Sequence, residues 1–124
     1  MTALVVITAL VAGSLGAVIR YATARLFAAH PSRLPWAVLI VNVVGSMIGG
    51  VVLGLSQAGA WGADARLVVL SGFCGGLTTF STFSVETIQL TLEGRMRAAV
   101  ASVAANLVLG IAAAALGWWL TTLL

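Results

Sequence analysis

The third apolar segment of the chain carries, near its middle, residue types that could bind ions inside a membrane. Gly75 and Gly76 stand side by side, and two threonines, Thr78 and Thr79, follow them closely. Glycine and threonine are poor helix formers, and a threonine hydroxyl competes for the hydrogen bonds of its own backbone. The sequence therefore predicts a helix that is either kinked or broken here. A break would leave carbonyl oxygens that a small hard cation can satisfy.

Two phenylalanines follow this glycine-rich stretch. Phe80 and Phe83 are three residues apart and would share one face of a helix. Because the edge of a phenyl ring carries the positive part of its quadrupole, two such rings could stabilise an anion without a fixed charge. Such a pair can also be ordinary core, but here it is surrounded by hydroxyl groups, which can donate hydrogen bonds to a dehydrated ion. These hydroxyls belong to Thr79, Ser81, Thr82 and Ser84.

Three further polar residues lie within apolar segments. The amide of Asn42 must find partners in lipid, so it either joins two helices or donates an N–H to an anion. Glu86 lies toward one end of its segment, where a carboxylate lining an aqueous vestibule is a better interpretation than a proton-coupling site. Arg20 either extends to the interface or attracts anions to such a vestibule.

The segments that position these residues are built for lipid. Of 124 residues, 61% are hydrophobic and 7% are charged, whereas a soluble domain carries about 25% charged residues. The sequence predicts an all-α membrane protein with a single domain, residues 1–124. Four spans cover about residues 2–27, 35–56, 66–92 and 98–120, with polar turns at 30–33, 57–64 and 93–97. Each span can cross a hydrocarbon layer of about 30 Å.

Charge and cysteine content exclude several classes of protein. The net charge of +3 comes from six arginines against three acids, too few basic residues for a nucleic-acid-binding surface. Cys74 is the single cysteine, so the chain forms no internal disulfide. The sequence contains no Ser/His/Asp set and no P-loop or zinc-protease motif, so an enzyme is the weakest interpretation.

Small residues predict close packing between the helices. They are spaced four apart in the pairs Gly45 and Gly49, Gly50 and Gly54, and Gly72 and Gly76, a spacing that lets helices in lipid approach closely. Four tightly packed helices leave no water-filled route through their own centre. Any ion route would therefore run between copies of the chain, which predicts a dimer.

The run from Gly75 to Ser84 resembles the signature of the Fluc (CrcB) fluoride channel family. The resemblance covers the whole chain with its four spans, and includes residues 16–21 in the first, residues 41–45 in the second and Glu86 after the motif in the third. It implies a third helix broken mid-span and an antiparallel, dual-topology dimer with two fluoride pathways along its interface. It also implies passive export of cytoplasmic fluoride across a bacterial inner (plasma) membrane, and a structural Na⁺ that is not conducted.

The resemblance also implies individual roles. Phe80 and Phe83 are similar to the family's pathway phenylalanines, Asn42 to its pore asparagine, and the hydroxyls of Thr79, Ser81, Thr82 and Ser84 to its polar track. Backbone oxygens of Gly75 and Thr78 would hold the Na⁺, with Arg20 and Glu86 at a vestibule. Ser102 stands where some members have a tyrosine, with Asn106 one turn on.

Alternatives remain at this point. Arginines concentrate beside the first and third turns, which places both termini outside and fits poorly with equal insertion in two orientations. The partner is therefore either a second copy, which we favour, or an oppositely oriented relative. A proton-coupled multidrug exporter would need an acid in its first span, and this chain has none there. A non-conducting structural subunit of a membrane complex is the other alternative.

Overall fold

The long apolar segments form helices because a backbone in lipid must satisfy its own hydrogen bonds. The computed structural model of the chain describes residues 1–30 and 34–124, and within these ranges every regular element is helical. The first, second and last spans are α1 (Ala3–Ala28), α2 (Trp36–Gln57) and α6 (Met96–Thr121). The third span, Ala63–Leu92, consists of α3 (Ala63–Arg66), η1 (Leu67–Cys74), α4 (Gly75–Leu77) and α5 (Ser81–Leu92). The prediction of four membrane-spanning helices is confirmed.

The ends of the helices follow local sequence signals. Thr2 caps α1, its side chain accepting a hydrogen bond from the backbone N–H of Val5. Glycines with positive φ, Gly59 at 76° and Gly94 at 74°, lie in the turns that follow α2 and α5. Of the turn predicted at 30–33, residues 31–33 lie outside the described ranges. The third span begins at Ala63, within the stretch predicted as a turn.

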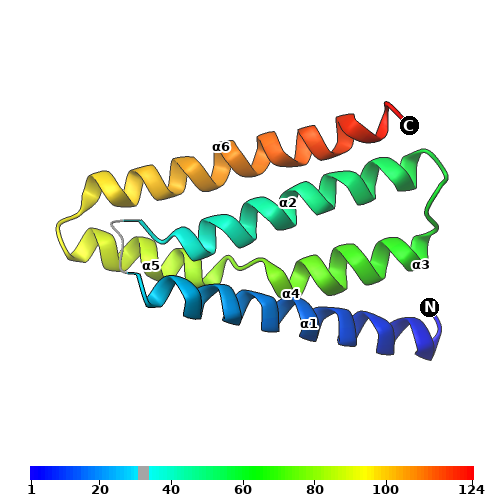
Figure 1. Cartoon of the computed structure of the whole chain (residues 1–124), viewed down its shortest axis with the longest axis horizontal. Helices are drawn as coiled ribbons and strands as arrows, with labels where there is room; N and C mark the ends of the chain where they lie inside the picture. The colour runs from blue at the N-terminus through cyan, green and yellow to red at the C-terminus, as the bar shows by residue number, and fades with distance from the viewer. Residues whose placement is uncertain (31–33) are drawn as a thin grey trace.

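The four spans run up and down, and both termini lie at the same end of the bundle (Figure 1). Helix α2 packs along α6, while α1 packs against η1 and α4. Helix α5 instead contacts α6. The third span therefore changes its main neighbour between its first and second halves.

Glycines bring the backbones into direct contact at both large interfaces. A Cβ at Gly76 would collide with the carbonyl of Gly13, and one at Gly50 would collide with the carbonyl of Ala114. The small residues predicted to permit close approach therefore do so between α1 and α4 and between α2 and α6. These contacts fix the position of the third span relative to α1.

An element that the sequence did not predict is η1, a π-helix over Leu67–Cys74. π-Helical turns are rare and occur mostly as short insertions in α-helices, frequently near functional sites. Here the π-helix leads directly into α4 and the polar stretch beyond it.

Candidate ion site at the middle of the third span

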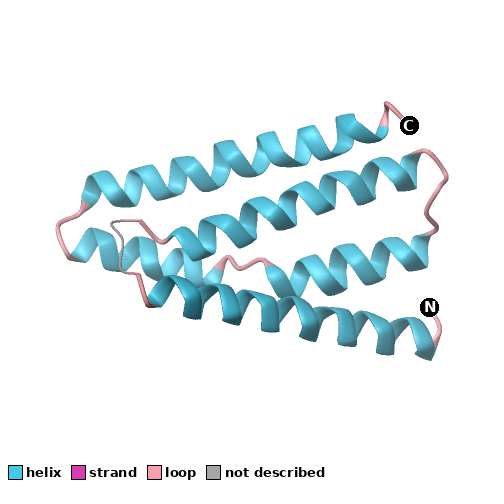
Figure 2. Ribbon diagram, viewed as in Figure 1, coloured by secondary structure: helices cyan, strands magenta, loops and turns pink. Residues whose placement is uncertain are grey.

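Helical backbone stops for three residues in the third span. Helix α4 ends at Leu77, Thr78 is extended with φ −83° and ψ 158°, and α5 begins at Ser81 (Figure 2). The backbone N–H and the hydroxyl of Thr78 both donate to the carbonyl oxygen of Cys74, each at 2.9 Å. These two hydrogen bonds satisfy the carbonyl oxygen of Cys74 at the point where the helix ends.

Asn42 of α2 makes two hydrogen bonds to the backbone of Thr79. Its Oδ1 accepts the Thr79 N–H at 2.8 Å, and its Nδ2 donates to the Thr79 carbonyl oxygen at 3.1 Å. Nδ2 also donates to Oδ1 of Asn106 at 3.1 Å, and Asn106 in turn donates to the carbonyl of Ser102 at 2.8 Å. Both N–H groups of the Asn42 amide therefore have protein acceptors, which matches the interpretation of Asn42 as a link between helices.

The side chain of Thr79 caps the helix that follows. Its Oγ1 accepts the backbone N–H of Thr82 at 3.1 Å and lies 3.3 Å from the hydroxyl oxygen of Ser81. An oxygen that accepts the N–H three residues ahead is the usual N-terminal cap. Thr79 is 9% exposed, so this polar group is buried beside the amide of Asn42.

The predicted hydroxyl track contains groups in different states. The hydroxyl of Ser84 donates to the carbonyl of Phe80 at 2.8 Å, so its proton is used within its own helix. The hydroxyl of Thr82 has no hydrogen-bond partner within residues 1–30 and 34–124, and its proton is available to a ligand. The Thr79 and Ser81 hydroxyls share one hydrogen bond, which leaves one of their two protons available.

The two phenyl rings form a tilted pair at the start of α5. The ring centroids of Phe80 and Phe83 lie 6.0 Å apart with an interplanar angle of 45°. Phe80 is 79% exposed, so its ring projects away from this chain. Its backbone N–H has no acceptor in the described part of the chain. An exposed ring and an N–H without an acceptor in the described chain thus lie together at the N-terminal end of α5, where the helix dipole favours negative charge.

Arg20 of α1 contacts the other side of the non-helical stretch. Its Nε donates to the carbonyl oxygen of Gly76 at 3.0 Å. In a continuous helix this carbonyl would accept the N–H of Phe80. A cation at the C-terminal end of a helix satisfies a carbonyl and interacts favourably with the dipole.

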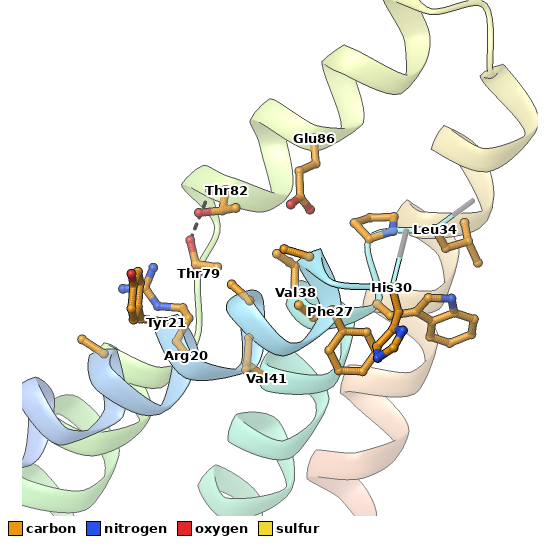
Figure 3. A pocket seen from close by; sticks show the side chains of 16 residues that line it. Arg20, Tyr21, Phe27, His30, Leu34, Val38, Val41, Thr79, Thr82 and Glu86 are labelled. Carbon is orange, nitrogen blue, oxygen red and sulfur yellow. Dashed lines mark hydrogen bonds between the residues drawn. The ribbon is translucent and has the colours of Figure 1, made fainter. Parts of the chain in front are cut away.

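Arg20 and Glu86, the two predicted vestibule residues, line one cavity of about 540 Å³ together with Thr79 and Thr82 (Figure 3). The Glu86 side chain points from α5 into this space. Its Oε2 is buried and has no hydrogen-bond partner among the described residues. The cavity extends to His30 at the end of the first span, and its walls are otherwise mostly apolar.

A second hollow, a groove of about 710 Å³, lies where small residues face outward. Its lining includes Gly45, Gly49, Cys74, Gly75 and Thr78. No described residue donates a hydrogen bond to the carbonyl oxygens of Gly75 or Thr78. Carbonyl oxygens are ligands that Na⁺ accepts in broken membrane helices, so this donor set fits the cation that the sequence predicted.

Two contacts of the site were not predicted from the sequence. The bond from Arg20 to Gly76 had a usable signal, because Gly13, Gly16 and Arg20 recur at helical spacing and so share one face of α1. The bond from Asn42 to Asn106 had no such signal in the sequence, because several polar groups were possible partners for a single amide.

These features define a multi-pass membrane protein with a cluster of donors, aromatic edges and unpaired carbonyl oxygens halfway along its third span. Among family models, the one described as "CrcB-like protein, Camphor Resistance (CrcB)" matches residues 7–118. The chain belongs to the CrcB family, as the motif predicted.

Relatives named as fluoride-specific ion channels match most of the chain. It is 38% identical to fluoride-specific ion channel FluC 1 of Streptomyces avermitilis, over 88% of this chain and 90% of the relative. It is 42% identical to fluoride-specific ion channel FluC 1 of Frankia casuarinae, over 82% and 84%. It is 39% identical to fluoride-specific ion channel FluC of Syntrophotalea carbinolica, over 87% and 89%.

Proposed function

We propose that this chain is a passive, fluoride-selective channel that exports cytoplasmic fluoride across a bacterial inner membrane. The observation that carries the proposal is its similarity, over more than four-fifths of its length, to proteins named as fluoride-specific ion channels. The chain acts as one domain, residues 1–124, and catalyses no covalent chemistry.

The geometry supports this function because it offers neutral donors rather than fixed charges. Fluoride holds its water tightly, so a narrow route must replace that water at each step and still release the ion. The ring edges of Phe80 and Phe83 and the available hydroxyl of Thr82 can do both. The pathway we propose includes these groups with Thr79, Ser81 and Ser84, and passes beside Asn42.

We infer that the working unit is an antiparallel dimer. Phe80 projects outward, and the groove that contains Gly75 and Thr78 is open. Unpaired carbonyl oxygens at membrane depth cost several kcal/mol each unless protein or an ion satisfies them. A second copy placed over this groove, with Na⁺ between the carbonyls of Gly75 and Thr78 of both copies, would supply the missing partners. An oppositely oriented relative would do the same.

The vestibule we propose is the cavity lined by Arg20 and Glu86. The guanidinium of Arg20 attracts anions from the aqueous side. The partly apolar walls of the cavity begin to remove water from these anions. Glu86 lies off the pathway in this proposal and takes part in no proton exchange.

Flux measurements on purified protein in liposomes test the function. Liposomes loaded with potassium fluoride should release fluoride within seconds to minutes after valinomycin balances the charge, while chloride-loaded liposomes retain their anion. Release of neither ion would reject the channel in favour of a structural subunit. Proton-driven uptake of a cationic dye would instead favour the multidrug exporter.

A further inference from the structure

The oxygen and both N–H groups of the Asn42 amide are hydrogen-bonded to the protein. This is unexpected for a residue beside an ion pathway. Its Oδ1 and Nδ2 meet the N–H and the carbonyl oxygen of the same residue, Thr79, at 2.8 and 3.1 Å. A side-chain amide that bonds both polar groups of one residue replaces the two bonds that residue would make in a helix. Thr79 is therefore held in its non-helical conformation by α2 rather than by its own span.

The second N–H of the amide fixes the amide itself. It donates to Oδ1 of Asn106 at 3.1 Å, and Asn106 is oriented by its own bond to the carbonyl of Ser102 at 2.8 Å. The order of donors leaves one orientation for each amide, because exchanging the O and N of Asn42 would place two donors or two acceptors together. Helices α2 and α6, which pack along their length, thus support Thr79 together.

The side chain of Thr79, supported in this way, contacts the start of α5. Its Oγ1 caps α5 through the N–H of Thr82 and contacts the Ser81 hydroxyl. The direction in which α5 leaves the non-helical stretch, and with it the placement of Phe80 and Phe83, depends on this cap. A rotation of the Thr79 peptide groups would displace both rings and the hydroxyls together.

We propose that Asn42 is a positioning residue, whose amide, oriented by Asn106, holds the backbone of Thr79 so that the hydroxyls and rings at the start of α5 face the ion pathway. This inference deepens the proposed function and rests on it for its meaning. The hydrogen bonds that carry it do not depend on which ion the protein conducts. In this role Asn42 acts through Thr79 and makes no direct bond to the ion.

Matched leucine substitutions of the two asparagines separate this role from others. Asn42→Leu and Asn106→Leu remove the same groups from neighbouring positions at similar volume, but only the first removes the bonds to Thr79. Hydrogen–deuterium exchange resolved to single residues reports directly on the Thr79 amide. Loss of its partner should speed exchange about tenfold in Asn42→Leu, with a change below about twofold in Asn106→Leu. Fluoride flux should fall at least about tenfold in Asn42→Leu and clearly less in Asn106→Leu.

Two outcomes would overturn the proposal. One is a loss of flux in Asn42→Leu with unchanged exchange at Thr79, which would place Asn42 directly on the ion. The other is an equal loss of flux in both variants. If Asn42→Leu does not fold, the unmodified protein supplies the test, because the Thr79 amide should exchange more slowly than the unpaired Phe80 amide, and equal rates would contradict us. Absence of fluoride flux in the unmodified protein would refute the proposed function and leave the exchange result standing.

Discussion

The two halves of the third span are held to the bundle in different ways. The first half, η1 and α4, contacts α1 through backbone atoms, and an added Cβ at Gly72 or Gly76 would collide with the backbone of α1. The second half, α5, begins at a cap that side chains of two other helices support, and it presents Phe80 to the outside. The first half is therefore fixed mainly by shape, with one added bond from Arg20 to Gly76, and the second by hydrogen bonds. Changes of volume should damage the first half most, and changes of polarity the second.

The largest effect should come from adding a methyl group to the first half. Gly76→Ala places its Cβ on the carbonyl of Gly13, and since both atoms belong to packed backbones, α1 must move. We expect a loss of about 3 kcal/mol or failure to fold, measured by thermal unfolding in detergent. Gly62→Ala, at φ −75° in the turn before α3, is the control, because apart from its chain neighbours no described atom lies within 4 Å of an added Cβ, and it should keep the chain folded. Equal stability of the two variants would show that close backbone contact does not hold this half.

Removal of sodium should disturb the non-helical stretch between α4 and α5, which joins the two halves. If Na⁺ satisfies the carbonyls of Gly75 and Thr78, replacing it with N-methyl-D-glucamine should abolish flux and lower stability. The stability change would be about 2.7 kcal/mol for a site saturated one-hundredfold. Restoring sodium should reverse both effects. Full flux and an unchanged unfolding temperature in sodium-free buffer would reject the cation site.

Ring substitutions should affect function in the second half alone. Phe80→Ile and Phe83→Ile keep the side chains apolar but remove the ring edges, so fluoride flux should fall at least about tenfold while the elution volume in size-exclusion chromatography stays the same. Phe73→Ile makes the same change in η1 and should keep flux within about twofold of the unmodified protein. Unmodified rates in both α5 variants would remove the rings from the pathway.

The smallest effect concerns the bond that closes α4. Arg20→Met removes the donor to the Gly76 carbonyl while keeping a similar stem, and should lower stability by about 1–2 kcal/mol. Arg25→Met, on the exposed surface one turn beyond, should change stability by less than about 0.5 kcal/mol. If both variants unfold at the same temperature, Arg20 serves only the vestibule, and a reduced flux at low fluoride concentration would be its remaining signature.

The fold was predictable from the sequence to the extent that lipid dictates it. Long apolar runs separated by short polar turns specify four spans, because an unsatisfied backbone is so costly in hydrocarbon. The π-helix at Leu67–Cys74 was not predictable, since its residues are ordinary apolar ones and its geometry depends on packing against α1. The early start of the third span at Ala63 depends on a single helical turn, which hydropathy does not resolve.

The candidate site was predictable in its residue types more than in its connections. The glycines, threonines and phenylalanines from Gly75 to Phe83 stand out by composition alone. The partners of Asn42 do not, because each of its bonds joins residues at least 37 positions apart and depends on how the helices pack. For Arg20 the spacing of Gly13, Gly16 and Arg20 indicates the face of α1 that meets the third span, but not the carbonyl that accepts its bond. The ion held by Gly75 and Thr78 is a prediction that sodium removal tests, and the dimer and the orientation of the chain are also predictions.

The attachment of α1 through a single face has a consequence for how this protein can diverge. Of its 26 residues only Gly16 is buried in the chain, and its close contacts with η1 and α4 involve Ala9, Gly13, Gly16 and Arg20 on one face. Aliphatic residues on the opposite face can replace one another freely as long as they remain soluble in lipid. Over evolutionary time most positions of this helix should therefore accept substitutions quickly, while the four contacting positions change slowly. An alignment of many relatives would show this difference in substitution rate along the helix.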